Sequence, residues 1–234
     1  MSDLGIALVT GGGSGIGRAV ATALALRGHE VVVTGRRAAA LEETVEQVRA
    51  AGGVARSQVH DVTDAEGLDR LLSDLGDGRL DVVVANAGTF VRGPVAELAV
   101  EDWTHQVDVN LHGVFLTLRG AVARMAHQSP VEGRRGHLFT VNSGAGVVGY
   151  PTGAAYAAAK HGLRGLVESL RPEVAPLGIK VTDLVVSATV ESEMSAGRDV
   201  PKIPAWTVGH TVVSCLELPG AANWDRVDLG QLRP

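Results

Sequence analysis

Short apolar runs alternate with longer amphipathic stretches along most of the chain. The first run, IALVT at 6–10, is rich in β-branched residues and predicts a buried strand. The stretch that follows, IGRAVATALALRG at 16–28, spaces its apolar residues as a helix does. Because strand and helix alternate in this way in βαβ units, the pattern predicts a parallel sheet that is covered by helices.

The same pattern places the remaining elements. Further strands are predicted at 30–34, 55–60, 80–85, 136–141, 179–186 and 225–232. Helices are predicted near 38–51, 64–75, 101–128, 152–175 and 205–217. We therefore predict an α/β fold with a doubly wound, mostly parallel seven-stranded sheet between two helical layers, a Rossmann-type sandwich. A ligand of such a sheet binds at the carboxyl ends of the strands.

Composition adds limits to this picture. The 234 residues contain no linker-like segment, so residues 1–234 are predicted to form one domain. Aromatic residues make up only 3%, which indicates a core of Ala, Val and Leu. The net charge of −5, without a basic cluster, argues against nucleic acid as a partner.

Compartment and metal content are also constrained. The N-terminus lacks the basic region of a signal peptide, and no apolar run reaches the ~20 residues that span a bilayer, so we expect a cytoplasmic protein without membrane contact. The single Cys215 excludes an internal disulfide, and the eight histidines lack metal-ligand spacing. No metal site is predicted.

A glycine-rich loop, TGGGSGIG at 10–17, joins the first strand to the first helix. Gly11, Gly15 and Gly17 have the spacing GxxxGxG. Glycines let the backbone turn sharply, and a helix N-terminus offers free N–H groups to a pyrophosphate. A glycine turn without a ligand is the alternative, but the position between strand and helix favours dinucleotide binding.

Tyr156 and Lys160 lie four residues apart in AAYAAAKHG. On a helix this spacing puts both side chains on the same face, so they can serve one site. Taken alone, the pair favours the structural alternative, a packed aromatic residue beside a solvated lysine, because short motifs match by chance.

Four motifs in order carry a family resemblance. They are the TGxxxGxG loop, NAG at 86–88, Ser143, and the Tyr156/Lys160 pair, with Ser143 thirteen residues before Tyr156. With these motifs the chain resembles the short-chain dehydrogenase/reductase family. The resemblance implies a catalytic tetrad of Asn110, Ser143, Tyr156 and Lys160. The cofactor contacts that it implies are Gly11, Ser14, Gly15, Ile16, Gly17, Arg36, Arg37, Asp61, Val62, Asn86, Ala87, Gly88, Tyr156, Lys160, Val190 and Ser192.

The resemblance gives the Tyr156/Lys160 spacing a chemical meaning. Reduction of a carbonyl creates an alkoxide that needs a proton, and a phenol of pKa ~10 is a poor donor and a poor base near neutrality. An ammonium about 5 Å away is expected to favour phenolate by about 3 kcal/mol, or roughly two pKa units. Ser143 is expected to donate a hydrogen bond to the substrate oxygen, and Asn110 to hold a water that relays protons to Lys160.

Structural alternatives stay open for three of these residues. Ser143 is also a candidate for capping a turn, and Asn110 for bonding its own helix. For Asp61, contact with adenine and N-capping of the helix near residue 64 are weighed evenly.

The chain departs from the family pattern after the sixth strand. Ser187 and Ala188 stand where most members have Pro-Gly, and Ser192 stands in place of Thr, so the shape of this turn is open. The predicted lid, residues 195–204, is short, which favours a small substrate.

Cofactor choice rests on VVVTGRR at 31–37. Members that prefer NAD place an acidic residue at the end of the second strand, where this chain has Gly35 followed by Arg36 and Arg37. Because a guanidinium pairs bidentately with phosphate, NADP(H) is the predicted cofactor, and NAD(H) is disfavoured. A pair of solvated arginines is the alternative.

The sequence therefore predicts an NADP(H)-dependent oxidoreductase that interconverts a small alcohol and its ketone or aldehyde. A biosynthetic ketoreductase acting on a larger intermediate, or a dinucleotide-binding regulator without turnover, are the alternatives. The small and apolar residues of helices 101–128 and 152–175 predict a homo-oligomer, and the family resemblance implies a tetramer, or else a dimer.

Overall fold

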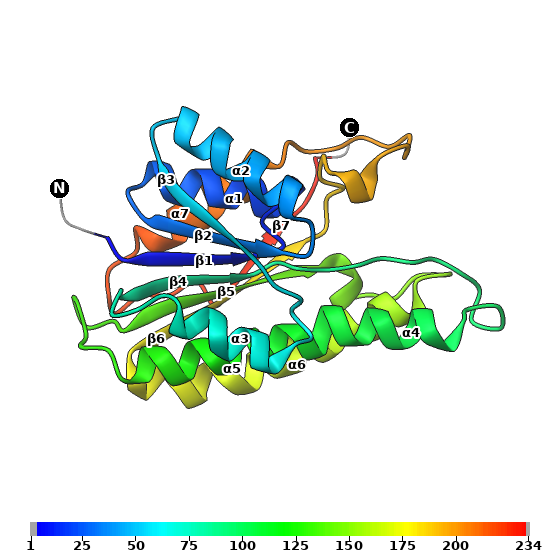
Figure 1. Cartoon of the computed structure of the whole chain (residues 1–234). Helices are drawn as coiled ribbons and strands as arrows, with labels where there is room; N and C mark the ends of the chain where they lie inside the picture. Colours follow the sequence, from blue (N-terminus) through cyan, green and yellow to red (C-terminus); the bar gives the residue numbers. More distant parts are fainter. Residues whose placement is uncertain (1–3, 233–234) are drawn as a thin grey trace.

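The computed structural model describes residues 4–232, and the outermost residues of the predicted domain, 1–3 and 233–234, lie outside this range. Its sheet has the strand order β3-β2-β1-β4-β5-β6-β7, and all neighbouring pairs are parallel (Figure 1). The strands are β1 (Ile6–Thr10), β2 (Glu30–Gly35), β3 (Val54–Val59), β4 (Leu80–Ala85), β5 (Gly136–Ser143), β6 (Ile179–Val186) and β7 (Arg226–Leu229). The predicted α/β fold and each predicted strand are confirmed.

Helices cover both faces of this sheet (Figure 1). One face carries α1 (Gly15–Leu26), α2 (Ala38–Ala50) and α7 (Trp206–Leu216). The other face carries α3 (Ala65–Ser73), α4 (Val100–Val107), α5 (Gly113–Ala126) and α6 (Ala154–Val174). Among the described residues, none of the helices has both the length and the apolarity that crossing a bilayer requires.

The two-residue period of the strands divides the core between these two layers. Ala7 and Val9 of β1 pack into one buried cluster together with Leu24 of α1. Ile6 and Leu8 of the same strand pack into the other cluster, beneath α3, α5 and α6. Strands that are buried on both faces need continuous apolar runs, which explains why IALVT is apolar along almost its whole length.

The predicted helix at 101–128 is interrupted. Between α4 and α5 the backbone forms a π-helical segment, Asp108–His112, in which Asn110 is fully buried. Such segments widen one turn of a helix and occur often at functional sites. The spacing of apolar residues in the sequence gives no indication of this single wider turn.

Strand order changes direction at β1. The chain proceeds outward from β1 to β2 and β3, and then resumes at β4 on the other side of β1. At such a switch point the connections leave in opposite directions, so a crevice opens beyond the carboxyl ends of β1 and β4.

Candidate functional site

A cavity of about 770 Å³ lies at the carboxyl ends of the strands. All predicted site residues line it except Gly15 and Gly17. The cavity therefore brings together the glycine loop, the end of β2, the NAG segment and the predicted tetrad.

Gly15 and Gly17, whose contact with the cofactor stays a prediction, let neighbouring segments approach the loop. Gly15 has φ +49°, and a Cβ there would lie 2.8 Å from that of Ser192. A Cβ on Gly17 would lie 2.6 Å from Nδ2 of Asn86. The two glycines thus allow Ser192 and Asn86, which follows β4, to pack against the turn at the N-terminus of α1.

Thr10, which the sequence analysis missed, ties this loop to the NAG segment. Its hydroxyl accepts hydrogen bonds from the backbone N–H groups of Asn86 and Ala87, both at 3.1 Å. In the other direction, Nδ2 of the Asn86 side chain donates hydrogen bonds to the carbonyls of Thr10 at 2.9 Å and Gly11 at 3.1 Å. The ends of β1 and β4 are thereby fixed to each other.

Asn110 is tied to the backbone around it. Its Nδ2 donates to the carbonyls of Thr89 at 2.8 Å and Gln106 at 2.9 Å, and its Oδ1 accepts from the Thr89 N–H at 3.3 Å. Both amide hydrogens are therefore used in holding the loop after β4 and the preceding helical turn. The alternative that Asn110 bonds its own helix is met in part, and its contact with a water stays a prediction.

Tyr156, Lys160 and Ser143 meet at the inner end of the cavity. The Lys160 Nζ lies 5.6 Å from the Tyr156 ring centroid and donates to the Val141 carbonyl at 2.8 Å. Ser143 ends β5, and its hydroxyl accepts from the Ala145 N–H at 3.2 Å, so it caps a turn as well as lining the cavity. The same-face prediction for the Tyr156/Lys160 pair is confirmed.

Burial sets the ionisation of this pair. It raises the pKa of Tyr156 to about 12, against the hydrogen bond of Ser143, which lowers it. It also lowers the pKa of Lys160 to about 8, against the charge of Asp183, which raises it. The net pKa of Tyr156 is therefore raised, not lowered by about two units as predicted, because desolvation of the phenolate is the largest influence on it. Tyr156 is a neutral phenol that can donate a proton.

The second strand ends in two exposed arginines, as predicted. The Arg36 Nη1 lies 4.0 Å from Oδ2 of Asp61, and the Arg37 Nη2 lies 2.7 Å from Oε2 of Glu193, just before the predicted lid. All four side chains are at least 40% exposed, so water screens these pairs. Both guanidiniums remain accessible from the cavity.

Asp61 is not the N-cap of α3. Asp64 has that role, since its side chain accepts from the Gly67 N–H at 2.9 Å. Asp61 accepts instead from the N–H and hydroxyl of Thr63, at 3.0 and 2.8 Å, and lines the cavity beside Val62. The hydrogen bonds to Thr63 help to hold its pKa below the usual range, although burial acts in the opposite direction.

The departure from Pro-Gly has a structural consequence. The N–H groups of Ser187 and Ala188 both donate to the Leu229 carbonyl, at 2.9 and 3.1 Å. A proline at position 187 could not make the first of these bonds. The turn after β6 is thus attached to β7, and Ser187 presents its side chain to the cavity.

The segment from Val190 to Ile203, which contains most of the predicted lid, folds back on itself. Val190 and Ile203 form a parallel bridge, and between them the chain makes one 3₁₀ turn, Glu193–Ser195. The Ser195 hydroxyl donates to the Val190 carbonyl at 2.6 Å. Val190 and Ser192 line the cavity, as predicted.

The cavity lining also includes residues that were not predicted, and three of them carry polar side chains that bear on the substrate. Tyr150, Arg92 and Arg198 line the cavity. Burial raises the pKa of Tyr150, and both guanidiniums act to lower it, which places them near the phenol. Tyr150 is the second of the two tyrosines in the chain, and that rarity was the available signal.

This combination defines a class: a doubly wound nucleotide-binding fold whose cavity holds a Ser-Tyr-Lys group. A family model described as short chain dehydrogenase matches residues 5–200. The chain belongs to the short-chain dehydrogenase/reductase family of NAD(P)-dependent oxidoreductases.

Individual relatives agree with this assignment. A short-chain dehydrogenase/reductase of Hericium erinaceus, eriH, is 38% identical over 185 residues, which are 76% of this chain and 72% of the relative. A putative ketoacyl reductase of monensin polyketide synthase from Streptomyces virginiae is 38% identical over 192 residues, which are 81% of this chain and 72% of the relative. A variant of the actinorhodin polyketide ketoreductase, solved with NADPH, superposes with a TM-score of 0.87 at 29% identity, covering 98% and 96% of the chains.

Proposed function

We propose that the protein is an NADP(H)-dependent oxidoreductase that interconverts a small alcohol and its ketone or aldehyde. The observation that carries this proposal is the meeting of Tyr156, Ser143 and Lys160 in the cavity that the glycine loop also lines. A proton donor, a hydroxyl and a buried ammonium in one cavity are what carbonyl reduction requires of a protein.

The residues around the cavity fit a dinucleotide with a 2′-phosphate. Gly11 has φ +64°, and Ser14, the N-cap of α1, makes no side-chain bond to the helix amides, so this end can receive a pyrophosphate. Arg36 and Arg37 follow a strand end without a carboxylate of its own. NADP(H) is the cofactor that this charge pattern favours, and the similarity to a ketoreductase solved with NADPH supports it.

NADPH, when bound, supplies the hydride. In the reductive direction Ser143 donates a hydrogen bond to the substrate carbonyl oxygen, and Tyr156 transfers its phenolic proton to the alkoxide. The raised pKa of Tyr156, about 12, keeps this proton in place until an alkoxide forms. Lys160 then stabilises the phenolate, while Asn110 holds the loop that borders the cavity.

A larger pathway intermediate is the second candidate substrate. Two observations favour it: the ketoreductase names among the relatives, and Arg92 and Arg198 beside Tyr150 at the cavity. Two guanidiniums suit a substrate whose distal part carries a phosphate or carboxylate. A dinucleotide-binding regulator without turnover remains the non-catalytic alternative.

We also propose a homo-oligomer, a tetramer or a dimer. On α4 and α5, Val100, Trp103 and Phe115 expose 73%, 42% and 41% of their surface, and exposed apolar residues that gather on neighbouring helices favour an interface. Most apolar residues of α6 are buried within the chain itself, so the argument rests on α4 and α5. Light scattering at micromolar concentration tests this, and a mass of only 24.2 kDa would reject it.

The proposed activity is tested by NADPH oxidation with a panel of ketones and aldehydes, ranging from small neutral compounds to thioesters of 3-oxo acids. Turnover with small ketones supports the main proposal, and turnover with thioesters alone supports the second. NADPH binding without turnover on any member of the panel would favour the regulator.

A further inference from the structure

β6 carries a carboxylate where its period predicts an apolar side chain. Ile179 and Val181 point into the core beneath α6, where they join Leu163 and Val167 of that helix. Asp183 is the next residue on this face and is only 4% exposed. A buried charge is costly unless it is paired, so its surroundings require an explanation.

Neutral donors hold this carboxylate. The Thr140 hydroxyl donates to Oδ1 at 2.7 Å, and Asn142 Nδ2 donates to Oδ2 at 3.0 Å. Asn142 in turn accepts the Ser143 N–H through its Oδ1 at 2.8 Å. Asp183 thus sets the orientation of the Asn142 amide, which fixes the backbone of Ser143.

Lys160 is a buried cation with no ion-pair partner among residues 4–232, and the charge of Asp183 acts on it. Its Nζ is bonded to the carbonyl of Val141, the residue between the two donors to Asp183. Tyr156 on α6 and Asp183 on β6 are the titratable groups that face it, and β5 contributes only that carbonyl. Within residues 4–232, Asp183 makes no ion pair within 4.0 Å, so it acts on Lys160 through space.

We propose that Asp183 is a positioning residue of the catalytic site: its charge keeps Lys160 protonated, and its hydrogen bonds hold Ser143 in place. The consequences for turnover rest on the proposed function. The ionisation of Lys160, however, is a property of the protein itself and is measurable without any substrate.

The chain offers a direct measurement, because it contains only three lysines, at positions 160, 180 and 202. In protein labelled with ¹³C-lysine, the Cε resonance that is lost in Lys160→Met identifies Lys160. Its titration midpoint is expected near pH 8. In Asp183→Asn this midpoint should fall by about one pH unit or more, because an opposite charge in a buried site shifts a pKa by that amount.

Two controls keep the test specific. In Asp183→Asn, the titration midpoints of Lys180 and Lys202 should not change. Thr140→Val removes one bond to the carboxylate but no charge, so it should shift the Lys160 midpoint by no more than a few tenths of a pH unit. If Asp183→Asn does not fold, the ¹³C carboxyl resonance of Asp183 in the unmodified protein should inflect at the Lys160 midpoint. An unchanged Lys160 midpoint in Asp183→Asn, or the absence of this inflection, would overturn the proposal.

Kinetics provide the second readout. If the protein reduces carbonyls, the alkaline limb of kcat/KM should move to lower pH in Asp183→Asn, because Lys160 loses its proton earlier. A uniform loss of rate without a shift in the pH profile would mean that Asp183 is only structural. Absence of turnover in the unmodified protein would defeat the proposed function, while the lysine titration would still decide this proposal.

Discussion

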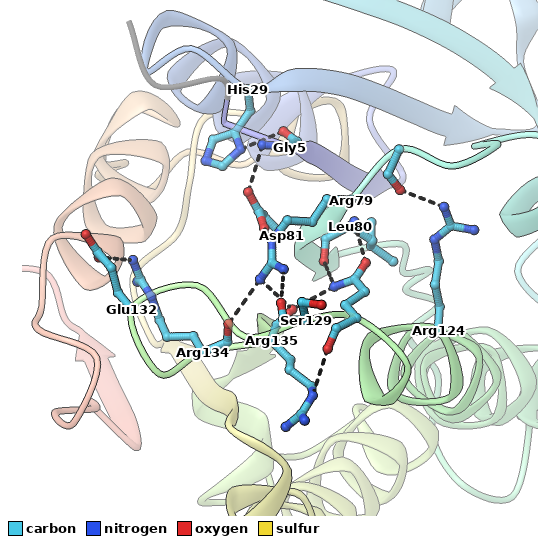
Figure 2. A network of polar contacts seen from close by, with 12 residues as sticks. Gly5, His29, Arg79, Leu80, Asp81, Arg124, Ser129, Glu132, Arg134 and Arg135 are labelled. Atoms are coloured by element: carbon cyan, nitrogen blue, oxygen red, sulfur yellow. Dashed lines mark hydrogen bonds and ion pairs between the residues drawn. The ribbon is translucent and has the colours of Figure 1, made fainter.

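The amino ends of the strands form one edge of the sheet, the amino edge, and their carboxyl ends form the carboxyl edge. These two edges use the same residue types in opposite ways. At the amino edge, arginine side chains bind carbonyls of the chain itself (Figure 2). At the carboxyl edge, arginines, hydroxyls and glycines line an open cavity. Polar groups whose partners lie within the chain contribute to stability, whereas those that face a cavity are available to a ligand.

Arg79 illustrates the amino edge. Its Nε lies 2.5 Å from Oδ1 of Asp81, and its terminal nitrogens donate to the carbonyls of Ser129, Arg134 and Arg135. The other oxygen of Asp81 accepts the Gly5 N–H at 2.7 Å. Figure 2 shows this group between the starts of the strands and the loop before β5. Arg79 and Asp81 together thereby join three segments that are distant in sequence: Gly5 before β1, the start of β4 and the loop before β5.

Arg92 and Arg198 illustrate the carboxyl edge. Within residues 4–232 neither forms an ion pair, and Arg92 makes one side-chain bond, to the Thr152 hydroxyl at 3.2 Å. Both line the cavity. The contrast indicates that substitutions at the amino edge should change stability, and substitutions at the carboxyl edge should change activity.

The largest effect is expected for Tyr156→Phe. Loss of the proton donor should lower the rate of NADPH-dependent reduction by about 10³-fold or more, while the melting temperature and NADPH affinity stay close to those of the unmodified protein. Tyr150→Phe, the matched change at the other tyrosine, should retain most of the turnover. Near-normal rates in Tyr156→Phe would contradict the assignment.

Arg79→Ala should have the largest effect on stability. It removes bonds to three backbone carbonyls and takes from Asp81 its ion-pair partner, so the free energy of unfolding should fall by about 3 kcal/mol. Arg226→Ala, which breaks an exposed pair with Asp228, should cost less than about 1 kcal/mol. Urea denaturation measures both. A large loss of kcat in folded Arg79→Ala would contradict the claim that the amino edge affects stability and the carboxyl edge affects activity.

Cofactor discrimination comes next. Arg36→Ala should raise KM for NADPH roughly ten- to a hundred-fold and change that for NADH little, since a charge-assisted hydrogen bond contributes about 1.5–3 kcal/mol. Equal KM values for the two cofactors in the unmodified protein would show that the arginines are only solvated.

The smallest effect concerns His137, near the amino end of β5. Burial lowers its pKa to about 3 from 6.5, so the unfolded chain takes up a proton below pH 6.5 that the folded chain does not. Stability should therefore fall with pH between 6.5 and 3, and this residue should account for about 2 kcal/mol between pH 7 and pH 5. In His137→Gln, urea denaturation at both pH values should show a correspondingly smaller difference. An unchanged difference would mean that His137 does not contribute.

The sequence predicted the strands and many, but fewer than half, of the residues that line the cavity, since apolar periods and family motifs are local signals. What it could not supply came from contacts between distant segments. Asp183 reads as one polar residue in a strand, and only the pairing of β5 with β6 places it against Thr140 and Asn142. The Tyr156 pKa was predicted in the wrong direction because its burial depends on the whole cavity.

The most direct test of the central claim, that the carboxyl edge is the ligand edge, is hydrogen–deuterium exchange with and without NADPH. We predict slower exchange in residues 10–17, 86–92 and 187–198, which border the cavity, and unchanged exchange in residues 76–81 and 128–135 at the amino edge. Unchanged exchange at the carboxyl edge under saturating NADPH, or protection confined to the amino edge, would contradict the account.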